Sequence, residues 1–342
     1  MPDTPADTLA SLGEFGLIAR LEALLAREGA TTPGVVLGLG DDTAILSPQP
    51  GQELLVTCDS MVAGRHYLPE VITPRELGRR AMAVNLSDVA AMGGQPLYAL
   101  VSLGLTAQTR VAMVEEMYQG FLAELRPWGA AVVGGNITKT EGPAFIDVTM
   151  LGQVPAGRAL RRGGGREGHA ILVTGQPGQA AAGLRGLSQP GQEADPELRR
   201  AYLTPTPRCA EGRAVGQSGL ASAMIDISDG LLGDLGHICE QSGTGALLEA
   251  ASLPVSPALA AAAGAWGLDP LDLVLSDSDD YELIITCPPE NVPDLMAVIA
   301  AVSPLAVSRI GRLVPASQGL GLALPDGGLR RLSPRSWDHF AG

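Results

Sequence analysis

The 342-residue chain contains one lysine, Lys139, so all but one of its 23 basic residues are arginine. A P-loop kinase needs a lysine at the end of a G-x-x-x-x-G-K-[ST] pattern, and this pattern is absent. The glycine-rich loop and the H-R-D and D-F-G motifs of protein kinases are absent as well. These absences exclude both of these kinase classes.

Cysteine and histidine are scarce. The four cysteines form no C-x-x-C pair, which indicates reduced thiols rather than a disulfide framework. The four histidines are scattered and form no H-E-x-x-H motif, so a histidine-based zinc site is not favoured. No apolar run reaches the length of a membrane span, and the polar, acidic N-terminus does not resemble a signal peptide. We therefore expect a cytoplasmic protein without a membrane partner.

The charge is strongly acidic, with 37 acidic and 23 basic residues and a net charge of −14. This balance argues against a nucleic acid or an anionic membrane as the partner. It does not exclude an anionic substrate, because a bound magnesium ion can invert the local charge. The 46% hydrophobic content indicates a folded chain, and the length is sufficient for two domains.

Apolar patterning predicts strands and helices that alternate along the chain, which indicates an α/β or α+β fold. Strands are predicted at 35–39, 54–57, 97–105, 131–133, 145–151, 170–174, 224–227 and 281–286. Helices are predicted from residue 13, at 74–91, 109–125 and 231–240, and over much of 178–218. A glycine- and arginine-rich connector at 155–168 predicts a boundary. We expect a loose tail at 1–10, an N-terminal domain at 11–154 and a C-terminal domain at 155–342.

Short acidic motifs follow several apolar runs or interrupt them. They are Gly40-Asp41-Asp42, Cys58-Asp59, Asn85-Leu86-Ser87-Asp88, Asp226-Ile227-Ser228-Asp229-Gly230 and Asp277-Ser278-Asp279-Asp280-Tyr281-Glu282. Carboxylates at strand ends are typical of sites for hard divalent cations. Asp88 interrupts an apolar helix, where an unpaired carboxylate would be costly. A turn at Asp41-Asp42 and an ordinary helix cap at Asp229 remain alternative interpretations.

A predicted turn at Gly134-Gly135-Asn136 would let a phosphate approach the backbone closely. The sequence shows no constellation of residues for covalent nucleophilic catalysis. Together with the acidic motifs, this predicts phosphoryl transfer assisted by Mg²⁺, which depends on positioning and on neutralising phosphate oxygens.

Taken in order, the motifs resemble the thiamine-monophosphate kinase family. The resemblance begins at Gly13-Glu14-Phe15-Gly16-Leu17-Ile18, includes the acidic motifs above, and ends at Trp337-Asp338-His339-Phe340. It implies the two-domain α/β (α+β) fold of aminoimidazole ribonucleotide synthetase. In that fold the N-terminal domain binds ATP and Mg²⁺ and forms the interface of a homodimer, and the C-terminal domain completes the active site. The implied enzyme transfers a phosphate directly from ATP to thiamine monophosphate, giving thiamine diphosphate in its biosynthesis.

The resemblance also implies roles for individual residues. The implied magnesium ligands are Asp42, Thr57, Cys58, Asp59, Asp88, Asn136, Asp226 and Asp229. The implied ATP contacts are Gly135, Asn136, Arg162 and Ser228. The implied contacts with thiamine monophosphate are His66, Asp279 and Trp337, and no residue is expected to form a covalent intermediate.

The chain departs from the family pattern at three places. Asn136 stands where many members carry Asp, Cys58 occupies a Thr/Ser-type position, and Asp277-Ser278-Asp279 replaces Gly-Gly-Glu. Because of Asn136 and Asp279, a non-catalytic nucleotide- or metal-binding relative remains an alternative. Related purine-pathway synthetases are weaker alternatives. Selenide water dikinase is a weaker alternative because it needs a reactive cysteine or selenocysteine in an N-terminal segment, and residues 1–40 contain no cysteine. The hydrogenase-maturation dehydratase is also weaker, because it ends in a cysteine whereas the given sequence ends in His339-Phe340-Ala341-Gly342.

Overall fold

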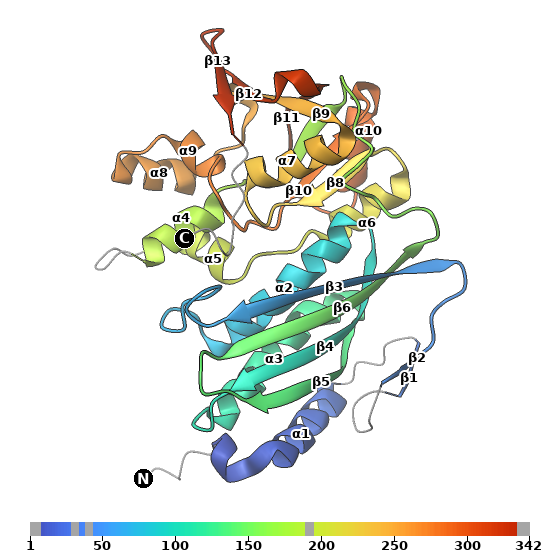
Figure 1. Ribbon diagram of the computed structural model, residues 1–342, viewed down its shortest axis with the longest axis vertical. Coiled ribbons are helices and arrows are strands. Elements are labelled where there is room, and N and C mark those ends of the chain that lie inside the picture. The colour runs from blue at the N-terminus through green and yellow to red at the C-terminus, as the bar shows by residue number, and fades with distance from the viewer. Residues whose placement is uncertain (1–7, 29–33, 38–43, 189–194, 334–342) are drawn as a thin grey trace. The chain divides into compact units, whose positions relative to one another are not determined.

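The computed structural model describes residues 8–28, 34–37, 44–188 and 195–333 (Figure 1). Contacts divide the chain into two compact units. The N-terminal unit comprises Met1–Val89 and Gln95–Ala156, and the C-terminal unit comprises Ala90–Gly94 and Gly157–Gly342. Each unit has its own sheet and its own buried core.

The N-terminal unit is built on a four-stranded sheet in the order β3-β6-β4-β5. Its strands are β3 (Gln52–Val62), β4 (Gln95–Leu105), β5 (Ala131–Lys139) and β6 (Phe145–Pro155). Only the β4–β5 pair is parallel. A hairpin of β1 (Val35–Leu37) and β2 (Ile45–Leu46) packs against one end of this sheet through Val35 and Leu46.

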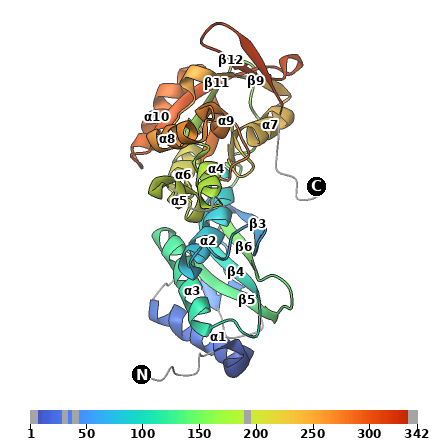
Figure 2. The same cartoon turned by 90° about the vertical axis from the view of Figure 1, so that its left-hand side faces the viewer.

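Helices cover one face of this sheet (Figures 1 and 2). They are α2 (Pro74–Ala91) and α3 (Val111–Leu125), with α1 (Leu9–Glu28) packed on α3 and a short 3-10 turn η1 (Arg126–Trp128) after it. Successive strand residues point to opposite faces, so Val101, Leu103 and Val148, all at most 1% exposed, point to the helices. On the other face Leu54 and Val56 are 48% and 64% exposed. Among the described residues, helices cover only the first face, and the β1–β2 hairpin packs on one end of the second face, beside Tyr98 and Leu151.

The C-terminal unit contains a seven-stranded sheet in the order β13-β12-β9-β11-β7-β10-β8. Its strands are β7 (Ala170–Thr174), β8 (Ala223–Asp226), β9 (Thr244–Glu249), β10 (Leu283–Cys287), β11 (Val307–Pro315), β12 (Leu320–Ala323) and β13 (Leu329–Leu332). Both β7 and β8 pair antiparallel with β10, so they are parallel to each other. The ends of β7 and β8 therefore meet the start of β10 at one edge of the sheet.

Both faces of the central strands are buried. Ile171 and Val173 enter a core shared with Leu235 of α7, whereas Leu172 enters a second core with Ile299 of α10. The helices are α4 (Gln179–Leu187), α5 (Pro196–Leu203), α6 (Cys209–Ser218), α7 (Leu231–Ser242), α8 (Pro257–Trp266), α9 (Pro270–Val274) and α10 (Val292–Ala300). Short 3-10 turns are η2 (Ala250–Ser252), η3 (Pro289–Asn291) and η4 (Ala316–Gln318). Sheets packed with helices in both units confirm the predicted α/β or α+β class.

Several predicted elements are confirmed, and two boundaries are wrong in ways that concern the site. The helix at 74–91 and the strand at 170–174 agree with α2 and β7, while α1 begins at Leu9 and is broken at Gly13. The strand predicted at 54–57 continues to Val62, because β3 pairs with β6 along its whole length. Cys58 and Asp59 therefore lie inside a strand and not at its end.

The turn predicted at Gly134-Gly135-Asn136 is also wrong, because these residues lie within β5. Gly135 allows β5 to lie close to β4. A Cβ atom there would lie 1.9 Å from the Val101 carbonyl oxygen of β4. The glycines therefore indicate tight strand pairing at this position.

Candidate active site

Three oxygen-bearing side chains of the N-terminal unit gather between β3 and α2. Thr57 and Asp59 are two residues apart in β3, so they share the face that points to the helices. The Thr57 hydroxyl donates a hydrogen bond to Asp88 on α2. Asp88 thereby gains a polar partner among the buried apolar residues that surround it in α2, such as Val89 and Ala90. Carboxylate and hydroxyl oxygens are ligands that suit Mg²⁺.

Cys58 and Asn136 lie on the opposite face of the same sheet. The Cys58 thiol donates to Asp147 at 3.2 Å and accepts from the Thr149 hydroxyl at 3.5 Å. Asn136 aligns with Ser102 of β4, and Ser102 aligns with Asp147 of β6, so Asn136 and Asp147 share this face. Within this unit the side chains of Cys58 and Asn136 therefore do not join Asp59 and Asp88.

The Cys58 thiol and its neighbour Asp147 form a polar group that the sequence reasoning missed. The Thr149 hydroxyl acts to lower the pKa of Cys58, but burial and the Asp147 charge outweigh it and raise the pKa above its usual value. Ser60 donates to the same carboxylate at 2.6 Å. The alternation of Asp147 and Thr149 with apolar residues in β6 was the available signal.

His66 follows β3 and is anchored by its own turn. Its Nδ1 atom accepts the Val62 N–H at 2.9 Å, and its backbone N–H donates to the Val62 carbonyl at 2.9 Å. With Nδ1 as acceptor, the proton of the neutral ring is on Nε2. His66 is therefore an oriented donor.

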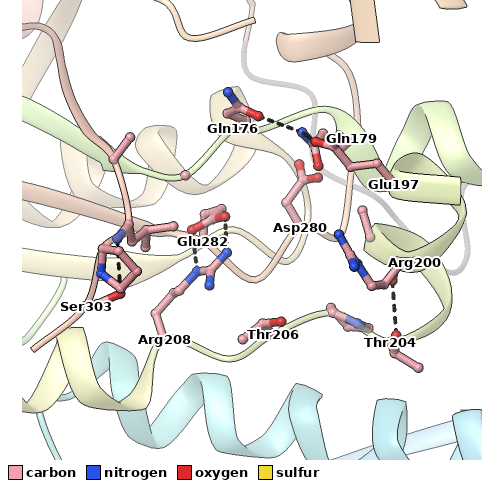
Figure 3. Close-up of a pocket in the computed structure, with 16 residues that line it drawn as sticks. Gln176, Gln179, Glu197, Arg200, Thr204, Thr206, Arg208, Asp280, Glu282 and Ser303 are labelled. Atoms are coloured by element: carbon pink, nitrogen blue, oxygen red, sulfur yellow. Dashed lines mark hydrogen bonds and ion pairs between the residues drawn. The ribbon is translucent and has the colours of Figure 1, made fainter. Parts of the chain in front are cut away.

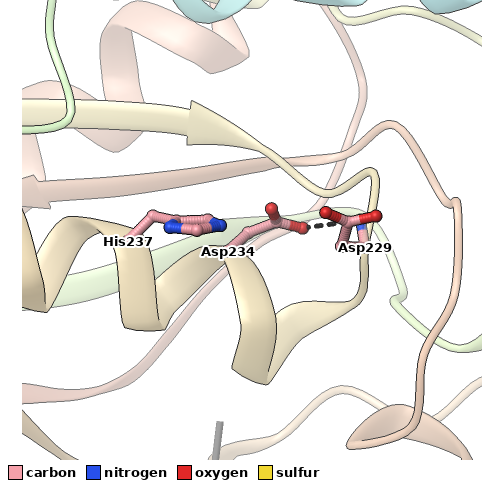
Figure 4. A group of neighbouring side chains, drawn as sticks. All are labelled: Asp229, Asp234 and His237. Carbon is pink, nitrogen blue, oxygen red and sulfur yellow. Dashed lines mark hydrogen bonds between the residues drawn. The ribbon is translucent and has the colours of Figure 1, made fainter. Parts of the chain in front are cut away.

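In the C-terminal unit, the predicted Asp226–Asp229 motif lies at the end of β8. Asp226 is the last residue of the strand, pairs in register with Leu283 and is 3% exposed. The helix-cap interpretation of Asp229 is wrong, because the N-cap of α7 is Gly230 and has no side chain. Asp234, in the first turn of α7, accepts the Asp229 N–H at 3.0 Å (Figure 4). It also accepts the Ser228 N–H at 3.0 Å.

Acidic groups are concentrated at this turn. Burial, and secondly the charge of Asp226, raise the pKa of Asp234 from 3.8 to about 8. Ligand atoms of Asp229, Asp234 and His237 all lie within 4.8 Å of one another. Such an excess of negative charge fits a hard divalent cation. Asp234 and His237 were missed by the sequence reasoning, although Asp234 interrupts an apolar helix as Asp88 does.

The acidic motif at 277–282 divides between two kinds of role. Asp280 accepts the Gly178 N–H at 2.6 Å and the Ala180 N–H at 2.9 Å, and it thereby caps the start of α4. Glu282 accepts the Thr174 hydroxyl at 2.6 Å and two bonds from Arg208, at 2.7 and 2.5 Å. Asp280 and Glu282 are therefore held by the unit's own framework.

Asp279 belongs to a segment that runs beside the turn after β8. The Tyr281 N–H donates to the Ile227 carbonyl, and the Ile227 N–H donates to the Glu282 carbonyl, each at 2.8 Å. This ladder lays the segment of Asp279 beside that of Asp226 and Ser228. Tyr281 has a φ of 54°, a left-handed conformation that is costly for a tyrosine.

The structure does not bring every predicted residue of this unit together. Arg162 lies at the C-terminal end of α7, where its carbonyl accepts the hydroxyl of Ser242 at 3.3 Å. Ser228 lies before the N-terminal end of the same helix. At 1.5 Å per residue, the 12-residue helix separates their backbones by about 18 Å. Asp42 and Trp337 lie outside the described residues.

A cavity of about 520 Å³ opens beside this framework (Figure 3). Its lining groups are largely bonded to one another. Gln179 donates to Gln176 at 2.8 Å and to Glu197 at 3.1 Å, and Arg208 is paired with Glu282. Among the described residues, none that is predicted to bind metal, ATP or substrate lines this cavity.

Known families match nearly the whole chain. The family described as AIR synthase related protein matches with its N-terminal domain over residues 40–154 and with its C-terminal domain over residues 166–320. The thiamine-monophosphate kinase of Salmonella typhimurium is 38% identical over 96% of this chain and 98% of its own. The chain belongs to the thiamine-monophosphate kinase family.

Solved structures of the thiamine-monophosphate kinase family agree with this assignment. The enzyme of Stenotrophomonas maltophilia superposes with a TM-score of 0.79 at 36% identity, covering 92% of this chain and 97% of its own. A structure described as AaThiL complexed with AMPPCP and TMP has a TM-score of 0.74 at 32% identity, covering 98% and 100%. In the parts of the chain that the structure describes, no helix is long and apolar enough to cross a bilayer.

Proposed function

We propose that this protein transfers the γ-phosphate of ATP to thiamine monophosphate, giving thiamine diphosphate and ADP, in the biosynthesis of thiamine diphosphate in the cytoplasm. The observation that carries the proposal is the match with thiamine-monophosphate kinases over 96% of the chain. The relative complexed with AMPPCP and TMP supports ATP and thiamine monophosphate as the two substrates, because this chain aligns with all of it.

The charge and donor chemistry of both units fit magnesium. Thr57, Asp59 and Asp88 supply oxygens in the N-terminal unit, and Asp226 and Asp229 supply carboxylates in the C-terminal unit. When bound, Mg²⁺ neutralises phosphate oxygens and holds them in place. Asp42, Cys58 and Asn136 stay predicted ligands; because the Cys58 thiol points away from Asp59, its carbonyl oxygen is the atom we assign.

In the proposed reaction, an oxygen of the thiamine monophosphate phosphate forms a bond with the γ-phosphorus. The bond between that phosphorus and the β–γ bridging oxygen breaks, and ADP leaves without a covalent enzyme intermediate. His66 would donate from Nε2 to thiamine monophosphate, with Asp279 and Trp337 as further contacts. Gly135, Asn136, Arg162 and Ser228 are the proposed ATP contacts.

We also propose that the protein is a homodimer joined through the N-terminal unit. The support is the face of the four-stranded sheet that none of the described helices covers, where Leu54, Val56 and Leu100 are 48%, 64% and 37% exposed. An apolar patch of this kind on one side of a sheet marks a protein interface. A second copy of the chain would bury it.

A product assay tests the proposal and separates it from the non-catalytic alternative. Purified protein is incubated with ATP, Mg²⁺ and thiamine monophosphate, and thiamine diphosphate and ADP are quantified by chromatography. We expect the two products in equal amounts and none after Mg²⁺ is chelated. Clear ATP binding without thiamine diphosphate would favour a nucleotide-binding protein without kinase activity.

A further inference from the structure

One side chain holds the turn that carries Ser228 and Asp229. A single oxygen of Asp234, Oδ2, accepts the backbone N–H groups of both residues at 3.0 Å, and Figure 4 shows the bond to Asp229. The Asp234 N–H in turn donates to the Gly230 carbonyl at 3.0 Å. Asp234 is 2% exposed, so water does not compete for these bonds. The turn is thus tied to the first turn of α7 at three points.

The N-cap residue of α7, Gly230, has no side chain that could hold this turn. Gly230 has a φ of 101°, and a Cβ atom there would lie 2.5 Å from the Ser276 carbonyl oxygen. The N-cap must therefore be glycine, which has no side chain to bond the preceding or following amides. An N-cap side chain would in any case accept N–H groups of the first helical turn, whereas Asp234 accepts those of the two residues before the helix.

These bonds fix the directions in which the side chains of Ser228 and Asp229 extend from the backbone. Because both peptide N–H groups point to Asp234, the orientation of both peptide units is set. The directions of the Cα–Cβ bonds of Ser228 and Asp229 are set with them. The same two amides are occupied and cannot bind a phosphate. Ser228 and Asp229 therefore cannot hold a phosphate through these N–H groups, and the placement of their side chains depends on Asp234.

We propose that Asp234 is a positioning residue, which aims the Ser228 and Asp229 side chains at the metal–nucleotide complex through hydrogen bonds and is not itself a metal ligand. The inference rests on the proposed function, since that function supplies the metal and the nucleotide. A carboxylate in this role is replaceable by any side chain with one suitable acceptor oxygen. A carboxylate that binds the ion directly is not, because its charge contributes to the affinity.

The two roles predict different results for Asp234→Asn and Asp234→Ala. The asparagine oxygen can accept both N–H groups, since in the structure one oxygen accepts both. Alanine leaves both amides without this acceptor. The matched control is Glu240→Ala, which removes an exposed carboxylate from the last turn of the same helix.

The test measures Mn²⁺ binding by electron paramagnetic resonance in the presence of a non-hydrolysable ATP analogue, together with turnover across a Mg²⁺ titration. We expect Asp234→Ala to weaken Mn²⁺ binding and to lower kcat by about 10–100-fold each, as for residues that orient metal ligands. Asp234→Asn should stay within about fivefold of the wild type, and Glu240→Ala should not differ from it. Equal losses in Asn and Ala variants, or no loss in Ala, would overturn the inference.

The folded state of each variant is checked by circular dichroism and thermal unfolding. If Asp234→Ala does not fold, Asp234→Ser replaces it, because the serine hydroxyl is too short to reach both amides. Wild-type protein that binds no Mn²⁺ would also overturn the inference. If the variants follow the expected order of Mn²⁺ affinity but no thiamine diphosphate forms, the inference stands and the proposed kinase function fails.

Discussion

Asp279 and Asp280 are neighbours in the sequence, yet the structure gives their carboxylates different surroundings. Asp280 is 8% exposed and caps α4, whereas Asp279 is half-buried beside the turn after β8. Burial raises the pKa of Asp280 from 3.8 to about 6, although the two N–H groups act to lower it. A carboxylate's role here depends on which groups the fold places around it.

The raised pKa of Asp280 predicts a pH-dependent stability. Folding favours its protonated form, so the stabilisation is complete below about pH 3.8 and is lost as the pH rises through about 6. Between these values the wild type should lose about 3 kcal/mol of unfolding free energy relative to Asp280→Asn. Urea unfolding of both proteins at a series of pH values measures this difference. Parallel pH profiles would contradict the assigned pKa.

Asp88 allows a separate test of the magnesium proposal. Asp88→Asn keeps an oxygen that can accept the Thr57 hydroxyl but removes the negative charge. We expect kcat/KM for thiamine diphosphate formation to fall at least about 100-fold, because a lost metal ligand costs several kcal/mol of transition-state stabilisation. Glu116→Gln, an exposed position on α3, is the control and should keep the wild-type rate. A near-normal rate for Asp88→Asn at saturating Mg²⁺ would remove Asp88 from the metal site.

Among the secondary-structure elements, the ends of β7 and β8 and the start of β10 carry a cluster of buried polar side chains, which includes Thr174, Asp226 and Glu282. The Glu282 side chain is 7% exposed and pairs with Arg208, which is 17% exposed. Burial acts to lower the pKa of Arg208, but the Glu282 charge and hydrogen bond outweigh it and raise the pKa, so Arg208 stays charged. This pair fixes the start of β10 directly after the segment that contains Asp279.

Removing one partner of this pair should destabilise the protein strongly. Arg208→Met leaves the buried Glu282 carboxylate without its counter-ion, which costs about 3–5 kcal/mol. Arg330→Met breaks a pair whose side chains are 51% and 55% exposed, Arg330 and Asp272, and should cost no more than about 1 kcal/mol. Unfolding free energies from urea titrations compare the two variants. Equal losses of unfolding free energy in the two variants would show that burial does not determine how strongly the Arg208–Glu282 pair stabilises the protein.

For the whole molecule, the face of the N-terminal sheet that none of the described helices covers predicts the assembly state. Val56→Glu places a charge at the centre of the apolar patch, so we expect the dimer to dissociate with at least about a 100-fold weaker association. Val302→Glu is the control, since Val302 is 49% exposed in the C-terminal unit. Sedimentation velocity measures the result. If the Val56→Glu protein sediments as the wild type does, another surface joins the copies or the protein is monomeric.

Much of this protein was predictable from local pattern. Apolar periodicity predicted α2 and β7 at their observed bounds, because their residues repeat with the helical and buried-strand periods. The ordered motifs identified the family, and the isolated acidic residue in α2 indicated a polar partner, which is Thr57. These features are local or depend on motif order, so the sequence carries them directly.

Only the tertiary structure decided which polar residues share a face. Cys58 and Asp59 are adjacent in sequence, but β3 continues past them because it pairs with β6 throughout, and the strand pleat sends their side chains to opposite faces. Asp234 became significant because folding brings it back to the amides of Ser228 and Asp229. Likewise Asp280 and Glu282 are framework residues because Gly178, Thr174 and Arg208, distant in sequence, reach them. A sequence determines which residues are available; contacts between distant segments determine which of them are already occupied.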